Sequence, residues 1–177
     1  CAGKLGFQNN YVFAVNKKFA PGITRMSQLR ENKHQGRYIV AGDEQFFNRP
    51  EWRHVRETYK AKFLEIKQMD VSLIYGALES NQVQVICAYS SDGRLNSKDI
   101  LILEDDEHVL PSYDAILLYS RKGKENVALQ RALAPLIEQR IDDHTMRAAN
   151  WSVDVGDGVT RKAPREAAKD VLAKLRT

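Results

Sequence analysis

The chain has 177 residues, of which 43% are hydrophobic and 28% charged, and it carries a formal net charge of +4. No apolar run approaches the roughly 20 residues that a membrane-spanning helix needs, and the first residues lack the apolar segment of a secretory signal. Basic residues are scattered among acidic ones rather than gathered in a stripe, so the composition predicts a globular protein that binds no nucleic acid.

The hydrophobic pattern alternates short apolar runs with amphipathic stretches. Up to residue 67 it predicts, in chain order, a strand at 11–15, a short helix ending at 29, a strand at 37–42, a helical stretch at 44–62 and a strand at 63–67. A helix at 71–79 follows, and then strands at 83–88, 100–103 and 113–119. The chain ends in predicted helices at 125–141, 142–151 and 164–175. The short helix would be capped by Thr24 or Ser27, and the helix at 71–79 by Asp70.

Three prolines mark helix positions in this pattern. Pro50 interrupts the stretch at 44–62, Pro135 predicts a kink, and Pro164 fits the first position of the last helix. The runs at 83–88 and 100–103 are nearly continuous in apolar residues, as expected of strands covered on both faces. Strands separated by helices predict an α/β fold with a largely parallel sheet.

Catalytic residue sets are absent from the sequence. The four histidines, His34, His54, His108 and His144, are far apart and follow no metal-ligand spacing. There is no Gly-x-Ser-x-Gly elbow, no phosphate-binding glycine-rich loop and no Cys-x-x-Cys pair. The acidic run at 104–107 is interpreted as a solvated turn after a strand. We therefore expect neither an enzyme nor a bound metal or cofactor.

Three segments together resemble the substrate-binding proteins of ABC importers for glycine betaine, carnitine and choline. They are Leu5-Gly6-Phe7-Gln8-Asn9-Asn10-Tyr11 leading into Val12-Phe13-Ala14-Val15; Met69-Asp70 followed by Val83 through Arg94; and Leu103-Glu104-Asp105-Asp106 followed by Leu110-Pro111-Ser112-Tyr113-Asp114-Ala115. The resemblance implies an α/β fold like that of type II periplasmic binding proteins, a two-lobed clamp. Residues 1–108 would form the second lobe, and 109–177 a crossover strand and the C-terminal helices of the first lobe, most of whose N-terminal part is lacking.

The resemblance also implies a ligand site. A quaternary ammonium has no N–H to donate, but the negative faces of aromatic rings attract its charge. The residues that match the family's site are Tyr11, Tyr89 and Tyr113 as the aromatic box, Arg49 as the partner of a ligand carboxylate, and Asn9 and Asn10 as polar contacts. The plainer alternatives are half-buried tyrosines at strand ends and an exposed arginine at a helix break.

The function implied is extracytoplasmic capture of a quaternary-amine osmoprotectant, in the periplasm or tethered to the outer face of the membrane. The ligand would be glycine betaine, choline or carnitine, delivered to the membrane permease of an ABC importer. Alternatives are ergothioneine or a related trimethylammonium compound, an effector-sensing domain of a transcription regulator, and a fragment that only makes protein contacts. Four explanations of the missing part stay open: a truncated chain, a proteolytic remnant, a degenerate relative, and one piece of a split assembly or of a domain-swapped or complementing dimer. In the first three, ligand affinity should be poor, because a clamp needs both lobes.

Overall fold

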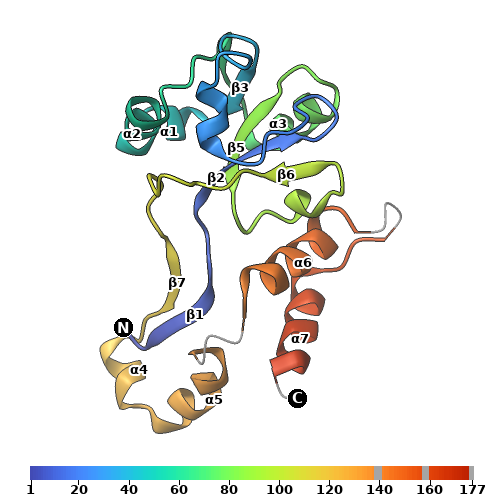
Figure 1. The fold of residues 1–177 in the computed structure, drawn as a ribbon. Coiled ribbons are helices and arrows are strands. Elements are labelled where there is room, and N and C mark those ends of the chain that lie inside the picture. Colours follow the sequence, from blue (N-terminus) through green and yellow to red (C-terminus); the bar gives the residue numbers. More distant parts are fainter. Residues whose placement is uncertain (138–140, 157–159, 176–177) are drawn as a thin grey trace. The chain divides into compact units, whose positions relative to one another are not determined.

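The computed structural model describes residues 1–137, 141–156 and 160–175, and the chain divides into two compact units. The first, the sheet unit, consists of Tyr11–Tyr89 and Ser97–Pro111. The second, the helical unit, consists of Cys1–Asn10, Ser90–Asn96 and Ser112–Thr177. The chain therefore passes between the units at residues 10–11, 89–90, 96–97 and 111–112 (Figure 1).

The sheet unit is built on a five-stranded sheet with strand order β4-β3-β5-β2-β6. Its strands are β2 (Tyr11–Asn16), β3 (Ile39–Gly42), β4 (Glu65–Gln68), β5 (Val85–Tyr89) and β6 (Ile100–Ile102). β3 pairs in parallel with β4 and β5, whereas β2 pairs antiparallel with β5 and β6. The prediction of a largely parallel sheet is therefore wrong for the pairings of β2. An apolar run reveals that a strand is buried on both faces, but strand direction depends on the connections around it.

Helices connect the parallel strands of this sheet. They are α1 (Glu44–Phe47) and α2 (Pro50–Tyr59) after β3, and α3 (Val71–Glu79) after β4. The chain moves from β3 outward to β4 and then back past β3 to β5. Because parallel crossovers are right-handed, these opposite moves place α2 and α3 on opposite faces of the sheet (Figure 1).

The helix ends of the sheet unit follow local chemistry. The predicted stretch at 44–62 is broken before Pro50, which is the first residue of α2 and needs no helical N–H partner there. Asp70 caps α3 as predicted, because its side chain accepts a hydrogen bond from the Ser72 N–H at 2.8 Å. The cap prediction for the short helix is wrong: this 3₁₀ helix, η1 (Met26–Arg30), has Arg25 at its N-cap.

Ser27 lies inside η1 and binds the acidic run instead. Its main-chain N–H, at 3.1 Å, and its hydroxyl both donate to the carboxylate of Asp106. Burial acts to raise the pKa of Asp106, but these hydrogen bonds hold that pKa below its ordinary value. Asp106 thus lies in a turn that is only partly covered, in keeping with the interpretation of 104–107 as a solvated turn, and it also has a hydrogen-bonding partner in η1.

Asp105 ties the same run to the end of α2. Its carboxylate accepts hydrogen bonds from the hydroxyl of Tyr59 and from the main-chain N–H groups of Val109, at 3.1 Å, and Leu110, at 2.7 Å. The Tyr59 oxygen in turn accepts from the Glu107 N–H at 2.9 Å. Burial, followed by the bond to Asp105, raises the pKa of Tyr59 above its ordinary value, so the phenol stays protonated. One buried hydroxyl thus anchors the segment that leaves the sheet unit.

Replacing Tyr59 by Phe is expected to lower the free energy of unfolding by about 1–3 kcal/mol, because Glu107 loses an acceptor and Asp105 a donor in a buried setting. Denaturant unfolding followed by tryptophan fluorescence measures the loss. Tyr38→Phe is the matched control, since the Tyr38 hydroxyl pairs with the ring of His34 at 3.0 Å outside this network. An equal loss in both variants would contradict the anchoring role.

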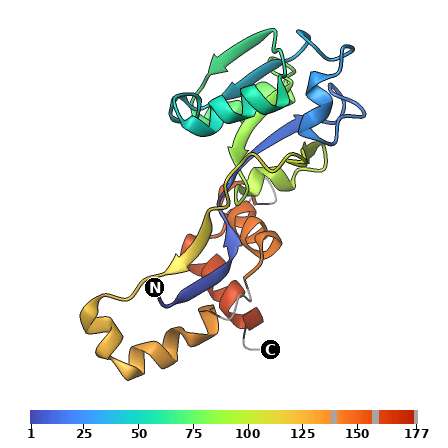
Figure 2. The same cartoon turned by 60° about the vertical axis from the view of Figure 1, so that its left-hand side comes forward.

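The helical unit holds a two-stranded ribbon and four described helices. They are β1 (Gly3–Gln8) and β7 (Asp114–Leu117), then α4 (Arg121–Glu125), α5 (Val127–Ile137), α6 (Asp143–Asp154) and α7 (Pro164–Leu175). β1 and β7 pair antiparallel, and Figure 2 shows them side by side. Among the described residues, no helix is long and apolar enough to cross a bilayer.

Several predictions for the helical unit need correction. β1 was not predicted, because its sequence is polar and glycine-rich. The helix predicted at 125–141 corresponds to α5, which begins at Val127, whereas Glu125 ends the separate short helix α4, which was not predicted; residues 138–140 of the predicted range lie outside the described part of the chain. Asp142 is the N-cap of α6 rather than its first residue, and its side chain accepts from the Thr145 N–H at 2.7 Å. The last helix has the predicted bounds.

The compact units also differ from the predicted ranges 1–108 and 109–177. Residues 1–10 join the helical unit because β1 pairs with β7. Residues 90–96, which include the 3₁₀ helix η2 (Gly93–Asn96), join it because they pack on α6; a Cβ at Gly93 would lie only 2.2 Å from the main-chain nitrogen of Trp151. Their assignment to two lobes of a clamp stays a prediction.

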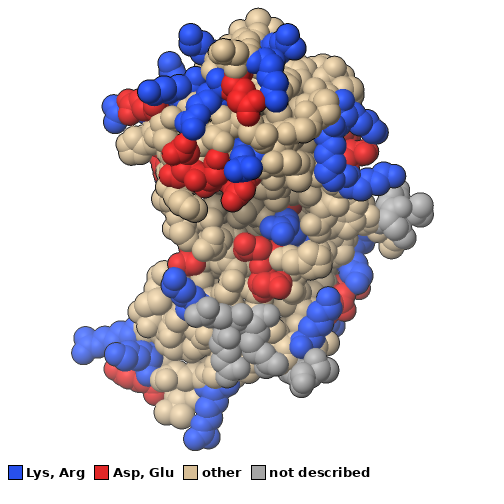
Figure 3. Space-filling view, in the orientation of Figure 1, with Lys and Arg blue, Asp and Glu red and all other residues tan. Residues whose placement is uncertain are grey.

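Charge is mixed on the surface. On the face in Figure 3, Lys and Arg side chains lie among Asp and Glu side chains.

Candidate functional site

Two of the predicted box residues lie opposite each other in the sheet unit. Tyr11 opens β2 and Tyr89 closes β5, and the two are direct partners in the antiparallel register. Directly opposed residues project from the same face of a sheet, so the rings meet. Their centroids are 5.1 Å apart at 33°, and their hydroxyl oxygens are 3.4 Å apart. Burial, and then the bond to Tyr89, raises the pKa of Tyr11 above its ordinary value.

The Tyr11 ring of this pair packs on an aromatic cluster in the core of the sheet unit. The Phe46 ring lies 4.6 Å from the Tyr11 ring, and it also packs within 6 Å of Phe13 and Trp52. Phe46 and Phe13 are fully buried. Asp43 positions Phe46, because the Asp43 side chain caps α1 by accepting from the Phe46 N–H at 2.6 Å. The Tyr11 ring is therefore backed by the rigid core of the unit.

Arg49 contacts the same tyrosine. It lies between α1 and α2, and its guanidinium carbon is 5.7 Å from the centroid of the Tyr11 ring, within the range of a cation–π interaction. The Nε–H of Arg49 donates to the Glu51 carboxylate at 3.3 Å, and 12% of the Glu51 side chain is exposed. A delocalised cation thus already lies against a ring that was predicted to bind one.

A pocket of about 610 Å³ opens beside Tyr89. It is lined by Tyr89 together with Asp43, Glu44, Gln45, Gln68, Met69, Asp70 and Val71. Hydrogen bonds from Ser72 hold the pKa of Asp70 below its ordinary value, so its carboxylate is ionised at neutral pH. Carboxylates beside an aromatic ring give this pocket a preference for cations.

Sequence reasoning missed this pocket. Asp43 directly follows β3, and Asp70 follows β4 by two residues. The two strands are parallel neighbours, so their carboxyl ends meet at one edge of the sheet, where ligands of open α/β sheets commonly bind. An acidic residue just past each strand was the signal available. Arg49 lines a different hollow, of about 470 Å³, with Glu51, His54 and others.

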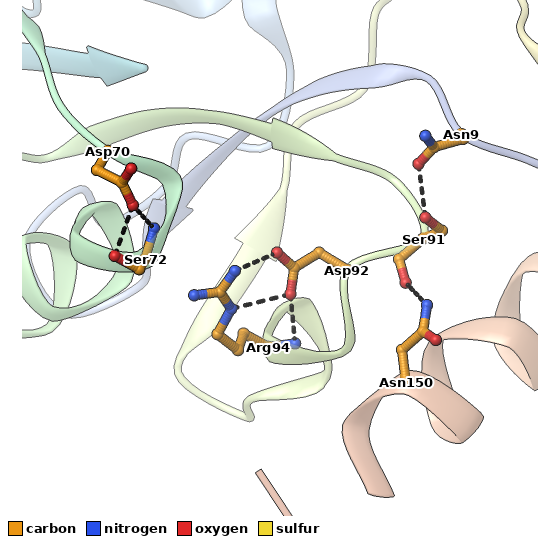
Figure 4. A network of polar contacts seen from close by, with 7 residues as sticks. All are labelled: Asn9, Asp70, Ser72, Ser91, Asp92, Arg94 and Asn150. Atoms are coloured by element: carbon orange, nitrogen blue, oxygen red, sulfur yellow. Dashed lines mark hydrogen bonds and ion pairs between the residues drawn. The ribbon is translucent and has the colours of Figure 1, made fainter. Parts of the chain in front are cut away.

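The other three predicted site residues belong to the helical unit. The Tyr113 N–H donates to Asn10 Oδ1 at 2.6 Å. The Asn9 side chain accepts from the hydroxyl of Ser91 at 2.6 Å, and Asn150 donates to the Ser91 carbonyl at 2.7 Å (Figure 4). Their roles as ligand contacts stay predictions.

The turn that carries Ser91 is closed by an ion pair. The guanidinium of Arg94 donates to the Asp92 carboxylate from Nε, at 3.0 Å, and from Nη2, at 2.7 Å (Figure 4). The Arg94 N–H also donates to the same carboxylate at 3.0 Å. The last residues of the second resembling segment thus have a structural role in holding the turn after β5.

Comparison with known proteins finds one matching family and several similar proteins. Residues 1–174 match the family described as the substrate-binding domain of ABC-type glycine betaine transport systems. The ergothioneine transport permease/ergothioneine-binding protein EgtU of Helicobacter pylori is 26% identical over 98% of this chain and 31% of its own length. The glycine-betaine-binding protein of Pseudomonas aeruginosa is 30% identical over 94% of this chain and 56% of its own length. The chain thus spans about a third to just over half of these curated relatives.

Solved structures agree in fold. The crystal structure of a glycine betaine/carnitine/choline ABC transporter protein superposes with a TM-score of 0.79 at 26% identity, covering 98% of this chain and 63% of that one. Lactococcal OpuAC, in its closed conformation with glycine betaine, gives a TM-score of 0.58 at 18% identity, which is a likeness of fold alone. These likenesses confirm the predicted α/β fold of the type II periplasmic-binding-protein kind.

Proposed function

The chain belongs to the family of substrate-binding domains of ABC-type glycine betaine transport systems, and from this premise we propose that it binds a small quaternary-amine ligand outside the cytoplasm. The family consists of binding domains rather than enzymes. The single observation that carries the proposal is the opposed pair Tyr11 and Tyr89, with a cationic side chain already against one ring.

The chemistry of this pair suits a trimethylammonium group. Such a group is large, carries a diffuse charge and offers no N–H, so ring faces recognise it better than hydrogen-bond acceptors do. The carboxylates of Asp43 and Asp70 in the adjoining pocket add a long-range attraction for positive charge. Tyr113 is proposed as a third ring of the site, on the strength of the sequence resemblance.

Arg49 points to a ligand with a carboxylate. A guanidinium fork matches a carboxylate in geometry and charge, which a choline hydroxyl cannot equal. We therefore favour glycine betaine, carnitine or ergothioneine over choline as the ligand. The names of the relatives from Pseudomonas aeruginosa and Helicobacter pylori are in keeping with this choice.

The partner proposed is the membrane permease of an ABC importer. The Helicobacter relative combines a permease and a binding protein in its name, which supports a direct functional link between the two. The ligand would be handed to that permease from the outer side of the membrane.

A fluorescence titration with glycine betaine, choline, carnitine and ergothioneine tests the proposal. We expect saturable quenching that weakens by about 2- to 30-fold in Tyr89→Ala, the effect of one ring in a cation–π contact. Tyr89→Phe retains the ring face and should keep most of the affinity. Tyr38→Ala removes a tyrosine away from the pair and serves as the control. A flat response to all four compounds would overturn the claim that this chain binds them.

A further inference from the structure

A set of hydrogen bonds joins segments that are far apart in the sequence, where the chain passes between its units. We call it the crossing junction, and it consists of Gln8, Asn9, Asn10, Ser90 and Tyr113. Its centre is Ser90, which is 6% exposed. The Ser90 hydroxyl accepts from the Asn10 N–H at 2.9 Å and donates to the Gln8 carbonyl at 3.0 Å. The Ser90 N–H donates to the Asn10 carbonyl at 2.8 Å.

The side chain of Asn10 extends the junction to a third segment. Its Oδ1 accepts from the Tyr113 N–H at 2.6 Å, and its Nδ2 donates to Gln8 Oε1 at 2.6 Å. The Asn9 N–H donates to the Tyr113 carbonyl at 3.0 Å. A ligand contact by the Asn10 amide would therefore compete with bonds that the amide already makes within the chain.

The predicted aromatic residues all adjoin this junction. Tyr11 directly follows Asn10, Tyr89 directly precedes Ser90, and the main chain of Tyr113 is itself a member. Consecutive Cα atoms are about 3.8 Å apart, so a change in the backbone of the junction also displaces the backbone of the tyrosine next to it. A recognition site works only when its groups keep their spacing to within about half an ångström.

On the basis of the proposed function, we propose that Ser90 and Asn10 are positioning residues for the quaternary-amine site. Ser90 holds the backbone at the point where Tyr89 ends one segment and Tyr11 begins the other, and Asn10 holds the main chain of Tyr113. The hydroxyl of Ser90 matters because it bridges a donor and an acceptor on one segment, which no apolar side chain can do.

Ser90→Ala tests this role in the ligand-free chain and in titration. With ¹³C-labelled tyrosine, we expect the ring resonances of both Tyr11 and Tyr89 to shift, and the dissociation constant for glycine betaine to rise about tenfold. Ser90→Thr retains the hydroxyl and should restore both. Ser27→Ala is the matched control, because it also removes a hydroxyl hydrogen bond, to Asp106, away from the junction. It should change neither readout.

Asn10→Ala provides a second, independent variant. It removes the acceptor of the Tyr113 N–H, so the Tyr113 resonance should shift while that of Tyr89 stays in place, because the main-chain bonds between Asn10 and Ser90 remain. Ring resonances that stay at their wild-type positions in both variants would overturn the proposal. If the wild-type chain binds no ligand, the proposed function fails, while the resonances still decide whether the junction positions the tyrosines.

Discussion

Arg49→Ala is expected to weaken binding of glycine betaine by about 10- to 100-fold, since a hydrogen-bonded charge pair is worth about 1.5–3 kcal/mol. The same variant should change the affinity for choline by less than about threefold. Only glycine betaine offers a carboxylate to the guanidinium. In the proposed site, choline would place just its trimethylammonium group against Tyr11 and Tyr89, and the variant keeps both rings. The Arg49 side chain makes no capping bond to α2, so its loss spares the helix end.

Isothermal titration of both ligands against wild type and variant measures this difference. Arg53→Ala is the matched control, because Arg53 is an exposed arginine of α2, the helix that Arg49 precedes. Equal losses for glycine betaine and choline would mean that Arg49 maintains the site as a whole rather than reading a carboxylate. No loss for either would exclude Arg49 from ligand binding.

Phe46→Ala is expected to lower the free energy of unfolding of the sheet unit by about 3–5 kcal/mol, the range for truncating a buried phenylalanine. Phe46 is 0% exposed, and its ring packs 4.6 Å from that of Tyr11 and 5.8 Å from those of Phe13 and Trp52. The ring is thus shared between the core and the site, and its removal leaves a cavity under Tyr11.

Urea unfolding monitored by tryptophan fluorescence measures the loss, because Trp52, one of the two tryptophans, borders the cavity. Leu73→Ala is the control: Leu73 is 59% exposed, and its truncation should change stability by less than about 0.5 kcal/mol. A loss under 1 kcal/mol for Phe46→Ala would show that the aromatic cluster repacks without this ring.

The strands that carry the site could be predicted from local pattern. The apolar runs at 11–15 and 83–88 correspond to β2 and β5, and the helix after Asp70 begins where its cap residue indicated. These features depend on side chains a few residues apart, whose alternation or helical spacing is visible in the sequence. β1 shows the opposite case, because its polar sequence becomes a strand only through pairing with β7.

The sequence by itself determined the family, the strands of the sheet unit and the identity of Tyr11, Tyr89 and Arg49 as candidates. Only the tertiary structure decided that Tyr11 and Tyr89 are cross-strand partners, that Asp43 and Asp70 line one pocket, and that Ser90 joins two crossing segments. The physical reason is separation along the chain. The two tyrosines are 78 residues apart, and contacts over such distances depend on strand direction and register, which local propensity does not encode.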